Sequence, residues 1–426
     1  MRISPFLSAF IAAATLATGC DIENEGLEPP ADELIFPVGL AMDPGGRYLY
    51  VANANFDLRY NGGTVVTVDL EAVDESQSQG AVLDTRDRSI VLPGSSVRLG
   101  TFASDLALSP DGARLFVPVR GDNSVTWIEI DDGGGRRLRC WDGVEGGETP
   151  RCAGDHVIGS GTNDLGLRLP SEPYGIAFAG DRDYAIVTHA DDGDVSLIAD
   201  VSGRPELVDV QGDLPAAASG IAVHPLTGRV YVAHRGASVL STLDVYDGSS
   251  IDAIAAEDRP AIVPRTSVPI DVISTGSDSR ALVFHPDGHE AYVTNRSPRS
   301  VLKLDTALGD SGVPVNEWRD AIPLGQGPSR IVVHEEPGTG RLLVYVVCFD
   351  DGVVYAIDAA AGRVDGILWT GAGPHAIAFD DTRRWIFVAS FVTSTIAVFD
   401  DDPSRETYRE RLFTIGTPKQ PHGAGT

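Results

Sequence analysis

The segment Ala218–Asp247, ASGIAVHPLTGRVYVAHRGASVLSTLDVYD, decides the fold because its pattern recurs along the chain. Gly220–Val223 is a short apolar run between turn residues, which indicates a strand. His224–Gly228 is typical of a turn, since proline fixes one backbone dihedral and glycine can take a positive φ. Val230–Ala233 and Val239–Tyr246 carry the β-branched and aromatic residues that favour two further strands. The segment therefore predicts an antiparallel three-stranded unit.

Six other segments share this order of apolar run, turn and second strand. The equivalent positions are spaced by 66, 70, 45, 61, 49 and 46 residues, and they are Gly39, Asp105, Gly175, Gly220, Ala281, Arg330 and Ala376. The shortest spacings match the ~40–50 residues of a four-stranded propeller blade. One blade cannot bury both of its faces, so the copies must stack around an axis. We expect an all-β chain that forms a seven-bladed β-propeller with four-stranded antiparallel blades over residues 33–420.

The sequence leaves open which strand closes the ring, and it predicts which face carries the long insertions. Either Tyr408–Ile415 or Glu33–Pro37 could supply the outer strand that completes the last blade. Long insertions at residues 71–98, 131–170 and 247–277 follow the third strands of their blades. In an up-and-down blade this connection lies opposite the blade-to-blade crossings, so we expect the loop between Cys140 and Cys152 on that opposite face.

The second strands carry a recognisable motif. Tyr292-Val293-Thr294-Asn295, and less closely Tyr50–Asn53 and Tyr231–His234, resemble the strand motif of the YVTN-type β-propeller family. The resemblance covers roughly residues 37–420 and implies the seven-bladed ring. Members of the wider superfamily include lactonase-like enzymes as well as surface and scaffold proteins, so the resemblance does not select an activity.

Residues 1–20 are predicted to be an export signal with a short apolar stretch, too short for the ~18 residues of a membrane span. Leu16–Cys20 resembles a bacterial lipobox, although leucine lies one place further from the cysteine than usual. We expect lipidation at Cys20, with an ordinary cleavable signal as the alternative. The acidic residues 21–32 are predicted to be a flexible tether, and residues 421–426 a C-terminal tail. These features place the chain in the cell envelope, attached to a membrane.

The net charge limits the classes of partner, and the cysteines limit the choice between a disulfide and a metal site. The net charge of −28 argues against nucleic acid and anionic lipid surfaces, which would repel the chain. Cys140 and Cys152 are expected to form a disulfide in an oxidising compartment, and a metal site is a rival that no second ligand pair supports. Buried Cys348 is expected to be inert. We expect no cofactor and no metal; a calcium ion at the Asp-rich turn 191–194 stays open, although its spacing is not that of an EF-hand.

Propellers commonly bind ligands at the central channel, on the face that carries the crossings. The alignment predicts that Asp105, Tyr174, Arg280, Arg330 and His375 lie there. Just outside them we expect the residues that end the second strands, namely Asn53, His189, His234, Arg235, Asn295 and Arg296. Arginine and histidine gathered in an acidic protein suit an anionic ligand, because guanidinium binds carboxylate bidentately. The alternative is that these groups only pair with neighbouring carboxylates.

The chain contains no Gly-x-Ser-x-Gly, HExxH or phosphate-loop motif, so no catalytic residue is assigned. The leading expectation is a non-catalytic envelope lipoprotein whose propeller binds a protein or glycan partner. The alternative is a lactonase-like hydrolase that acts on a sugar-acid lactone at the channel mouth. A cofactor-dependent dehydrogenase is a third class that no residue requires.

Overall fold

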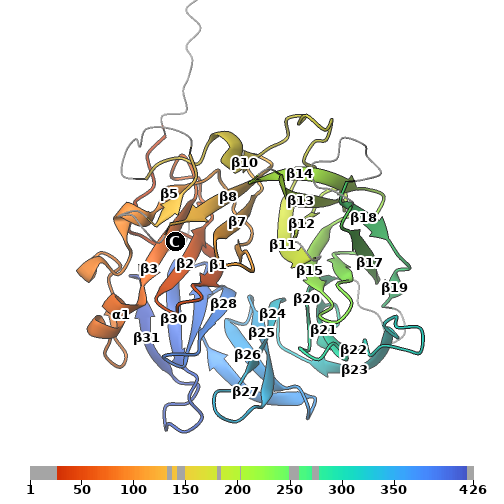
Figure 1. Ribbon diagram of the computed structural model, residues 1–426. Helices are drawn as coiled ribbons and strands as arrows, with labels where there is room; N and C mark the ends of the chain where they lie inside the picture. Colours follow the sequence, from red (N-terminus) through yellow and green to blue (C-terminus); the bar gives the residue numbers. More distant parts are fainter. Residues whose placement is uncertain are drawn as a thin grey trace, which may run out of the picture.

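The computed structural model describes residues 26–131, 137–141, 149–179, 184–201, 203–248, 259–270 and 278–419. They form seven antiparallel sheets that follow one another around a ring (Figure 1). The predicted seven-bladed propeller is therefore confirmed. The expected export signal, Cys20, the start of the tether and the C-terminal tail lie outside the described residues.

Each blade is a meander that runs from an inner strand to an outer strand. Blade one contains β1 (Pro37–Met42), β2 (Tyr48–Asn53), β3 (Thr64–Asp69) and β5 (Val97–Arg98). Blade two contains β6 (Ala107–Leu108), β7 (Arg114–Val119), β8 (Ser124–Ile130), β9 (Leu138–Arg139) and β10 (Val157–Ile158). Blade three contains β11 (Pro173–Ala179), β12 (Tyr184–His189), β13 (Val195–Val201) and β14 (Arg204–Gln211). Blade four contains β15 (Ala218–Val223), β16 (Val230–His234), β17 (Val239–Tyr246), β18 (Ala261–Pro264) and β19 (Val268–Pro269).

Blades five, six and seven each contain four antiparallel strands in chain order, and blade seven has one added strand. Blade five contains β20 (Ser279–Phe284), β21 (Glu290–Arg296), β22 (Arg299–Asp305) and β23 (Glu317–Pro323). Blade six contains β24 (Pro328–Glu335), β25 (Leu342–Cys348), β26 (Val353–Asp358) and β27 (Arg363–Trp369). Blade seven contains β28 (Pro374–Asp380), β29 (Trp385–Ser390), β30 (Thr395–Asp400) and β31 (Arg411–Ile415), with β4 (Val82–Leu83) added from the insertion of blade one. The described helices are α1 (Leu70–Ser76) and the short 3-10 turns η1 (Asp87–Ser89), η2 (Pro93–Ser95) and η3 (Gly154–His156).

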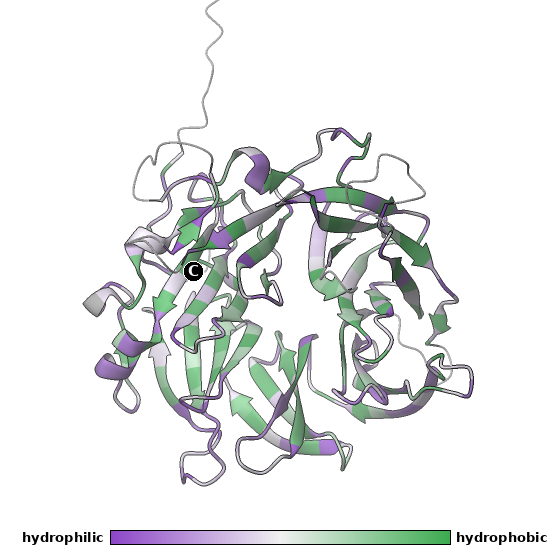
Figure 2. Cartoon of the chain, in the orientation of Figure 1, coloured by the Kyte–Doolittle hydropathy of each residue, from purple (hydrophilic) through white to green (hydrophobic). Residues whose placement is uncertain are grey.

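The repeated tyrosine explains why the blades stack. Tyr50, Tyr231, Tyr292 and Tyr345 on the second strands are fully buried, and each packs in one cluster with apolar residues of the following blade. Hydrophobic residues run along the strands while many connecting loops are hydrophilic (Figure 2). A ring of such contacts buries the apolar faces that a single blade would leave exposed.

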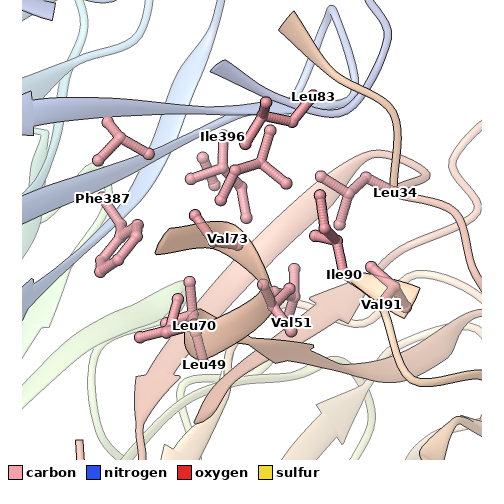
Figure 3. Packing of buried hydrophobic residues seen from close by; sticks show 14 of the residues in the cluster. Leu34, Leu49, Val51, Leu70, Val73, Leu83, Ile90, Val91, Phe387 and Ile396 are labelled. Carbon is pink, nitrogen blue, oxygen red and sulfur yellow. The ribbon is translucent and has the colours of Figure 1, made fainter. Parts of the chain in front are cut away.

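The seam between blades seven and one settles how the ring closes. β31 is the outer strand of blade seven, as the first of the two alternatives predicted, whereas residues 33–36 form no strand. β4 then pairs with β31 in parallel, and Gly416 N donates to Leu83 O at 2.8 Å. Leu70, Val73 and Phe387 belong to the buried apolar cluster that joins the two blades (Figure 3).

The disulfide between Cys140 and Cys152 is present, and its surroundings differ from the expected placement. The outer strand of blade two is split into β9 and β10, so the chain crosses the outer edge of the blade between them. At the described end of the loop, Arg98 N donates to Pro150 O at 2.9 Å, and an Arg151 guanidinium N–H donates to Asn61 O at 3.3 Å. Asn61 lies in the second-to-third connection of blade one. This end of the loop therefore reaches the face of the crossings instead of the opposite face.

The described part of the expected tether also lies against the ring. Asn61 donates from its side-chain amide to Gly26 O and from its backbone N–H to Leu27 O, both at 2.9 Å. Residues 26–32 thus follow the surface of blade one. Within the described residues, no helix is long and apolar enough to span a membrane.

Candidate binding site at the channel mouth

One backbone hydrogen bond repeats in all seven blades and builds one end of the central channel. The first residue after the second strand, or the last residue of that strand, donates its N–H to a residue on the crossing that leads into the blade. The seven bonds measure 2.8–3.1 Å and run from Ala54 to Phe36, Arg120 to Phe102, Ala190 to Glu172, Arg235 to Ala217, Arg296 to Asp278, Phe349 to Gly327 and Phe391 to Gly373. We call these two sets the donor and acceptor positions, and the end of the channel that they surround the mouth.

Six of the seven acceptor residues have a φ between +49° and +73°, and four of these six are not glycine. This left-handed conformation is uncommon for other residues and requires support from the surrounding fold. The repeated hydrogen bond supplies that support. The ring therefore holds two side-chain positions per blade beside the channel, outside the packed strands.

The mouth contains a cavity of about 350 Å³. Its lining includes residues of the donor and acceptor positions, namely Ala54, Phe102, Arg120, Arg296, Phe349 and Phe391, together with Phe56 from the loop after β2. A cavity of this size accommodates a small organic ligand.

Phenylalanines from blades six, seven and one, and from the crossing into blade two, form one side of the mouth. Phe56 lies 5.8 Å from Phe102 and 5.3 Å from Phe391, and Phe349 lies 6.1 Å from Phe391, measured between ring centroids. These separations are those of favourable aromatic pairs. Phe56 is nevertheless 57% exposed, so the group presents an apolar surface to the cavity.

Arginines from blades two and five form another part of the lining. Arg120 pairs with Glu172, Arg280 Nε lies 2.7 Å from Asp278 Oδ1, and an Arg296 nitrogen lies 4.0 Å from Asp350 Oδ2. Each of these guanidinium groups thus has one carboxylate next to it. This part of the lining keeps its positive groups close together within a strongly acidic protein.

Arg235 on blade four differs from these three arginines, because it has no described carboxylate at ion-pair distance. Its guanidinium lies 4.1 Å from the centroid of the Tyr174 ring and forms no ion pair with a described carboxylate. The Nε atom is buried and has no hydrogen-bond partner among the described residues. Burial lowers the pKa of Arg235 and the positive charges of Arg280 and Arg120 act in the same direction, whereas Tyr174 and the carboxylate of Asp278 oppose them. Arg235 is therefore a cation beside the mouth that forms no ion pair with a described carboxylate, and it is not among the residues that line the mouth cavity.

Below the mouth, an ion pair crosses the channel. Arg330 on β24 donates to Asp105 Oδ2 at 2.9 Å and to Ser104 O at 3.1 Å, which joins blade six to blade two. Both side chains line a smaller cavity of about 110 Å³ inside the channel. Tyr174 and Arg280 line this cavity and the mouth cavity alike. The pair thus narrows the channel beneath the mouth.

His375, at the inner strand of blade seven, lines the mouth cavity. Its Nδ1 lies 2.9 Å from Val38 O and donates to that carbonyl, so the neutral ring keeps Nε2 as an acceptor. Burial lowers the pKa of His375 to about 3, and the positive charge of Arg330 contributes. No described residue is hydrogen-bonded to Nε2.

The structure brings five of the seven predicted site residues together: Asp105, Tyr174, Arg280, Arg330 and His375. It does not bring His189 or His234 to the mouth, and these two assignments are corrected. Both imidazoles are fully buried. His189 donates from Nδ1 to Ser171 O and accepts at Nε2 from the Ser196 hydroxyl at 2.8 Å, and His234 Nε2 lies 2.8 Å from Ser241 Oγ. Their side chains point into the blade because the last residue of a strand still follows the strand's alternation.

Sequence reasoning missed the phenylalanines and Arg120. The signal was present in the donor position itself, which reads Ala54, Arg120, Ala190, Arg235, Arg296, Phe349 and Phe391 around the ring. The sequence alignment included this column only at Arg235 and Arg296, so Arg120, Phe349 and Phe391 were left out.

The three histidines that follow first strands have separate local partners. His224 Nε2 lies 3.1 Å from Thr306 O, His285 Nδ1 lies 2.7 Å from Asp287, and His334 Nε2 lies 2.8 Å from Asp401. Within the described ranges, no three histidine, cysteine or acidic side chains are grouped as a metal site would need.

No protein-family description and no curated protein matches this chain. Solved structures resemble it in fold. Hydrazine synthase of Kuenenia stuttgartiensis matches 89% of this chain and 98% of its own, with 16% identity and a TM-score of 0.58. A 6-phosphogluconolactonase candidate of Bacteroides uniformis matches 82% and 87%, with 13% identity and a TM-score of 0.55. The Cps50 (Swd1) propeller domain of Myceliophteria thermophila matches 85% and 95%, with 14% identity and a TM-score of 0.54.

At such identities the likeness describes the fold alone. The chain is a seven-bladed β-propeller that resembles lactonase-like and hydrazine synthase propellers.

Proposed function

We propose that this protein is a non-catalytic binding protein of the cell envelope, anchored through a lipid on Cys20, which takes an anionic group of its partner at the mouth. The observation that carries the proposal is the set of arginines that line the mouth cavity, Arg120, Arg280 and Arg296, with Arg235 beside them. A chain with a net charge of −28 repels anions over most of its surface. A positive mouth is therefore the favoured place for an anionic partner group to bind.

The polar side chains around the mouth favour binding over catalysis. Ser104 Oγ donates to Tyr174 O at 2.8 Å, and Ser329 Oγ donates to Val347 O at 3.2 Å. His375 is bonded to a backbone carbonyl instead of a serine or a carboxylate. Nucleophilic catalysis needs a hydroxyl or thiol within hydrogen-bond reach of its base. Ser104, Ser329 and His375 are instead hydrogen-bonded to backbone carbonyls.

The experiment compares two faces of the ring with one photo-crosslinking amino acid. Phe56 at the mouth and Leu226 on the opposite face are 57% and 55% exposed, so they form a matched pair. We expect a discrete envelope adduct when p-benzoylphenylalanine replaces Phe56, and none when it replaces Leu226. Equal adducts at both positions, or adducts only at Leu226, would contradict the proposal.

The envelope anchor has its own test. Cys20→Ala should abolish incorporation of radiolabelled palmitate and move the protein from the detergent phase to the aqueous phase. Cys348→Ala, which changes a buried cysteine, serves as the control and should keep the label. A Cys20→Ala protein that still carries the label would refute lipidation at this residue.

A lactonase-like hydrolase is the second candidate. The free, neutral Nε2 of His375 beside Arg330 favours it, because a neutral imidazole can act as a general base. The fold shared with the Bacteroides uniformis protein is consistent with it. Hydrolysis of 6-phosphogluconolactone that is lost in His375→Ala and retained in Arg363→Ala, at an exposed arginine of β27, would establish this function in place of binding.

A further inference from the structure

We infer that the mouth selects a monoanion joined to an apolar group, such as an aryl or alkyl carboxylate, over a hydroxylated anion. The inference rests on the proposed function and specifies the chemistry of the group that binds. It follows from the charge balance at the mouth, from its exposed aromatic surface and from the arrangement of the two.

The charge balance indicates one negative charge on the ligand. Five arginines surround the mouth and the channel below it, and four of them have a carboxylate partner: Arg120 with Glu172, Arg280 with Asp278, Arg296 with Asp350 and Arg330 with Asp105. Asp278 is also the carboxylate that acts on Arg235, so five arginines share four carboxylates and one positive charge is in excess. A single carboxylate would balance it, whereas a second negative charge on the ligand would compete with the four carboxylates already present.

The aromatic surface indicates an apolar group. Phe56 keeps more than half of its surface exposed although three other phenylalanine rings lie within 6.2 Å of it, namely Phe36, Phe102 and Phe391. An exposed apolar patch on a soluble face marks a binding surface. The phenyl rings offer no hydrogen-bond partner to sugar hydroxyls, so a hydroxylated ligand would lose its hydration without compensation.

The two surfaces line the same mouth cavity. The phenylalanines come from blades six, seven and one and from the crossing into blade two, while Arg120, Arg280 and Arg296 come from blades two and five. The Arg235 guanidinium on blade four lies 4.1 Å from the centroid of the Tyr174 ring, which lines the cavity from blade three, so its charge acts from just outside the lining. A ligand with a charged end and an apolar end therefore matches both surfaces at once.

The test is isothermal titration calorimetry of the full chain with four probes, which separate the requirement for a negative charge from the requirement for an apolar group. They are 3-phenylpropionate, its neutral analogue 3-phenylpropanamide, acetate and gluconate. We expect 3-phenylpropionate to bind at least tenfold more tightly than each of the other three, because only it satisfies both requirements. A short peptide with a C-terminal phenylalanine, in free-acid and amidated forms, shows whether a chain terminus or a free acid is the better source of the same chemistry.

Variants assign the binding to the two surfaces. Arg235→Gln removes the excess positive charge beside the cavity and should weaken 3-phenylpropionate about tenfold. Phe56→Ala should weaken 3-phenylpropionate by a similar factor and leave acetate unchanged. The matched controls Arg363→Gln and Leu226→Ala change an exposed arginine and an exposed apolar residue outside the mouth, and neither should alter binding.

The outcomes separate this inference from the proposed function. Gluconate or acetate binding as tightly as 3-phenylpropionate, with loss in Arg235→Gln, would overturn the apolar requirement while the mouth remained an anion site. Binding of 3-phenylpropanamide equal to that of the acid would overturn the requirement for a charge. Failure of all anions to bind at millimolar concentration would overturn both the inference and the proposed anion-binding mouth.

Discussion

Two phenylalanines four residues apart in blade seven show how differently the seam and the mouth are built. Phe387, inside β29, is fully buried in the apolar cluster that joins blade seven to blade one. Phe391, just after the end of the same strand, lines the mouth cavity. Positions inside the second strand are fixed by packing between blades, whereas the position after it is free of that packing. The same residue type therefore serves stability at one site and binding at the other.

The largest expected effect breaks the seam. Phe387→Ala should lower the free energy of unfolding by about 3–5 kcal/mol, because it removes a fully buried ring and leaves a cavity. Urea denaturation followed by circular dichroism measures the loss. Phe391→Ala is the matched control and should cost about 1 kcal/mol or less, since its ring is only partly buried. Equal losses in the two variants would refute the distinction between seam and mouth.

The next effect concerns another junction, between blades one and two. The double variant Cys140→Ala/Cys152→Ala opens a loop with a sequence separation of 12 and should lower the free energy of unfolding by about 3 kcal/mol. Reduction of the unmodified protein should reproduce the loss, while affinity at the mouth stays unchanged. A stability that does not respond to reduction would show that this junction depends on the surrounding contacts instead.

A smaller effect is expected beneath the mouth. Arg330→Met removes the partner of Asp105, whose side chain is only 13% exposed, and should cost about 2 kcal/mol. Adding Asp105→Asn should restore part of that stability, because the unpaired charge is then removed. Denaturation of the single and double variants gives the coupling between the two residues. Additive losses would show that the cross-channel pair is not coupled.

The most gradual effect is an acid-induced loss of stability. Burial lowers the pKa values of His189 and His234 to about 4 and that of His375 to about 3, below the value of 6.5 expected in the unfolded chain. The unfolded chain therefore binds more protons between these values. The contribution to stability is complete above pH 6.5 and is lost as the pH falls toward 4, by up to about 1.4 kcal/mol per pH unit for each histidine.

Variants assign this slope to the histidines. His375→Gln should reduce the slope between pH 6.5 and 5, whereas Phe387→Leu at the uncharged seam should lower stability equally at every pH. The Ser404 hydroxyl and backbone N–H lower the pKa of Asp402 to about 2, which lies outside this pH window. An unchanged slope in His375→Gln would show that its imidazole does not contribute.

The fold could be predicted because one pattern, repeated seven times, has only one way to bury its faces. The strand that completes the last blade could not be predicted, because both Tyr408–Ile415 and Glu33–Pro37 have strand-like sequences. Only their contacts in the folded ring decide between them. Part of the mouth could be predicted from the inner-strand alignment, which placed Arg330 and His375 correctly around the channel. His189 and His234 were misplaced because the direction of a side chain at a strand end depends on the exact register. The phenylalanines were missed because they follow the strands, where no periodicity marks them.

The pairing of β4 with β31 determines when the ring can finish folding during synthesis. A ribosome adds Val82 long before Thr414, yet the two are paired in the finished ring. Until the final blade emerges, β4 has no neighbour, and the apolar residues of α1 have only half of the cluster that later covers them. Synthesis must therefore keep this early segment from aggregating, and the ring can close only after blade seven has been made.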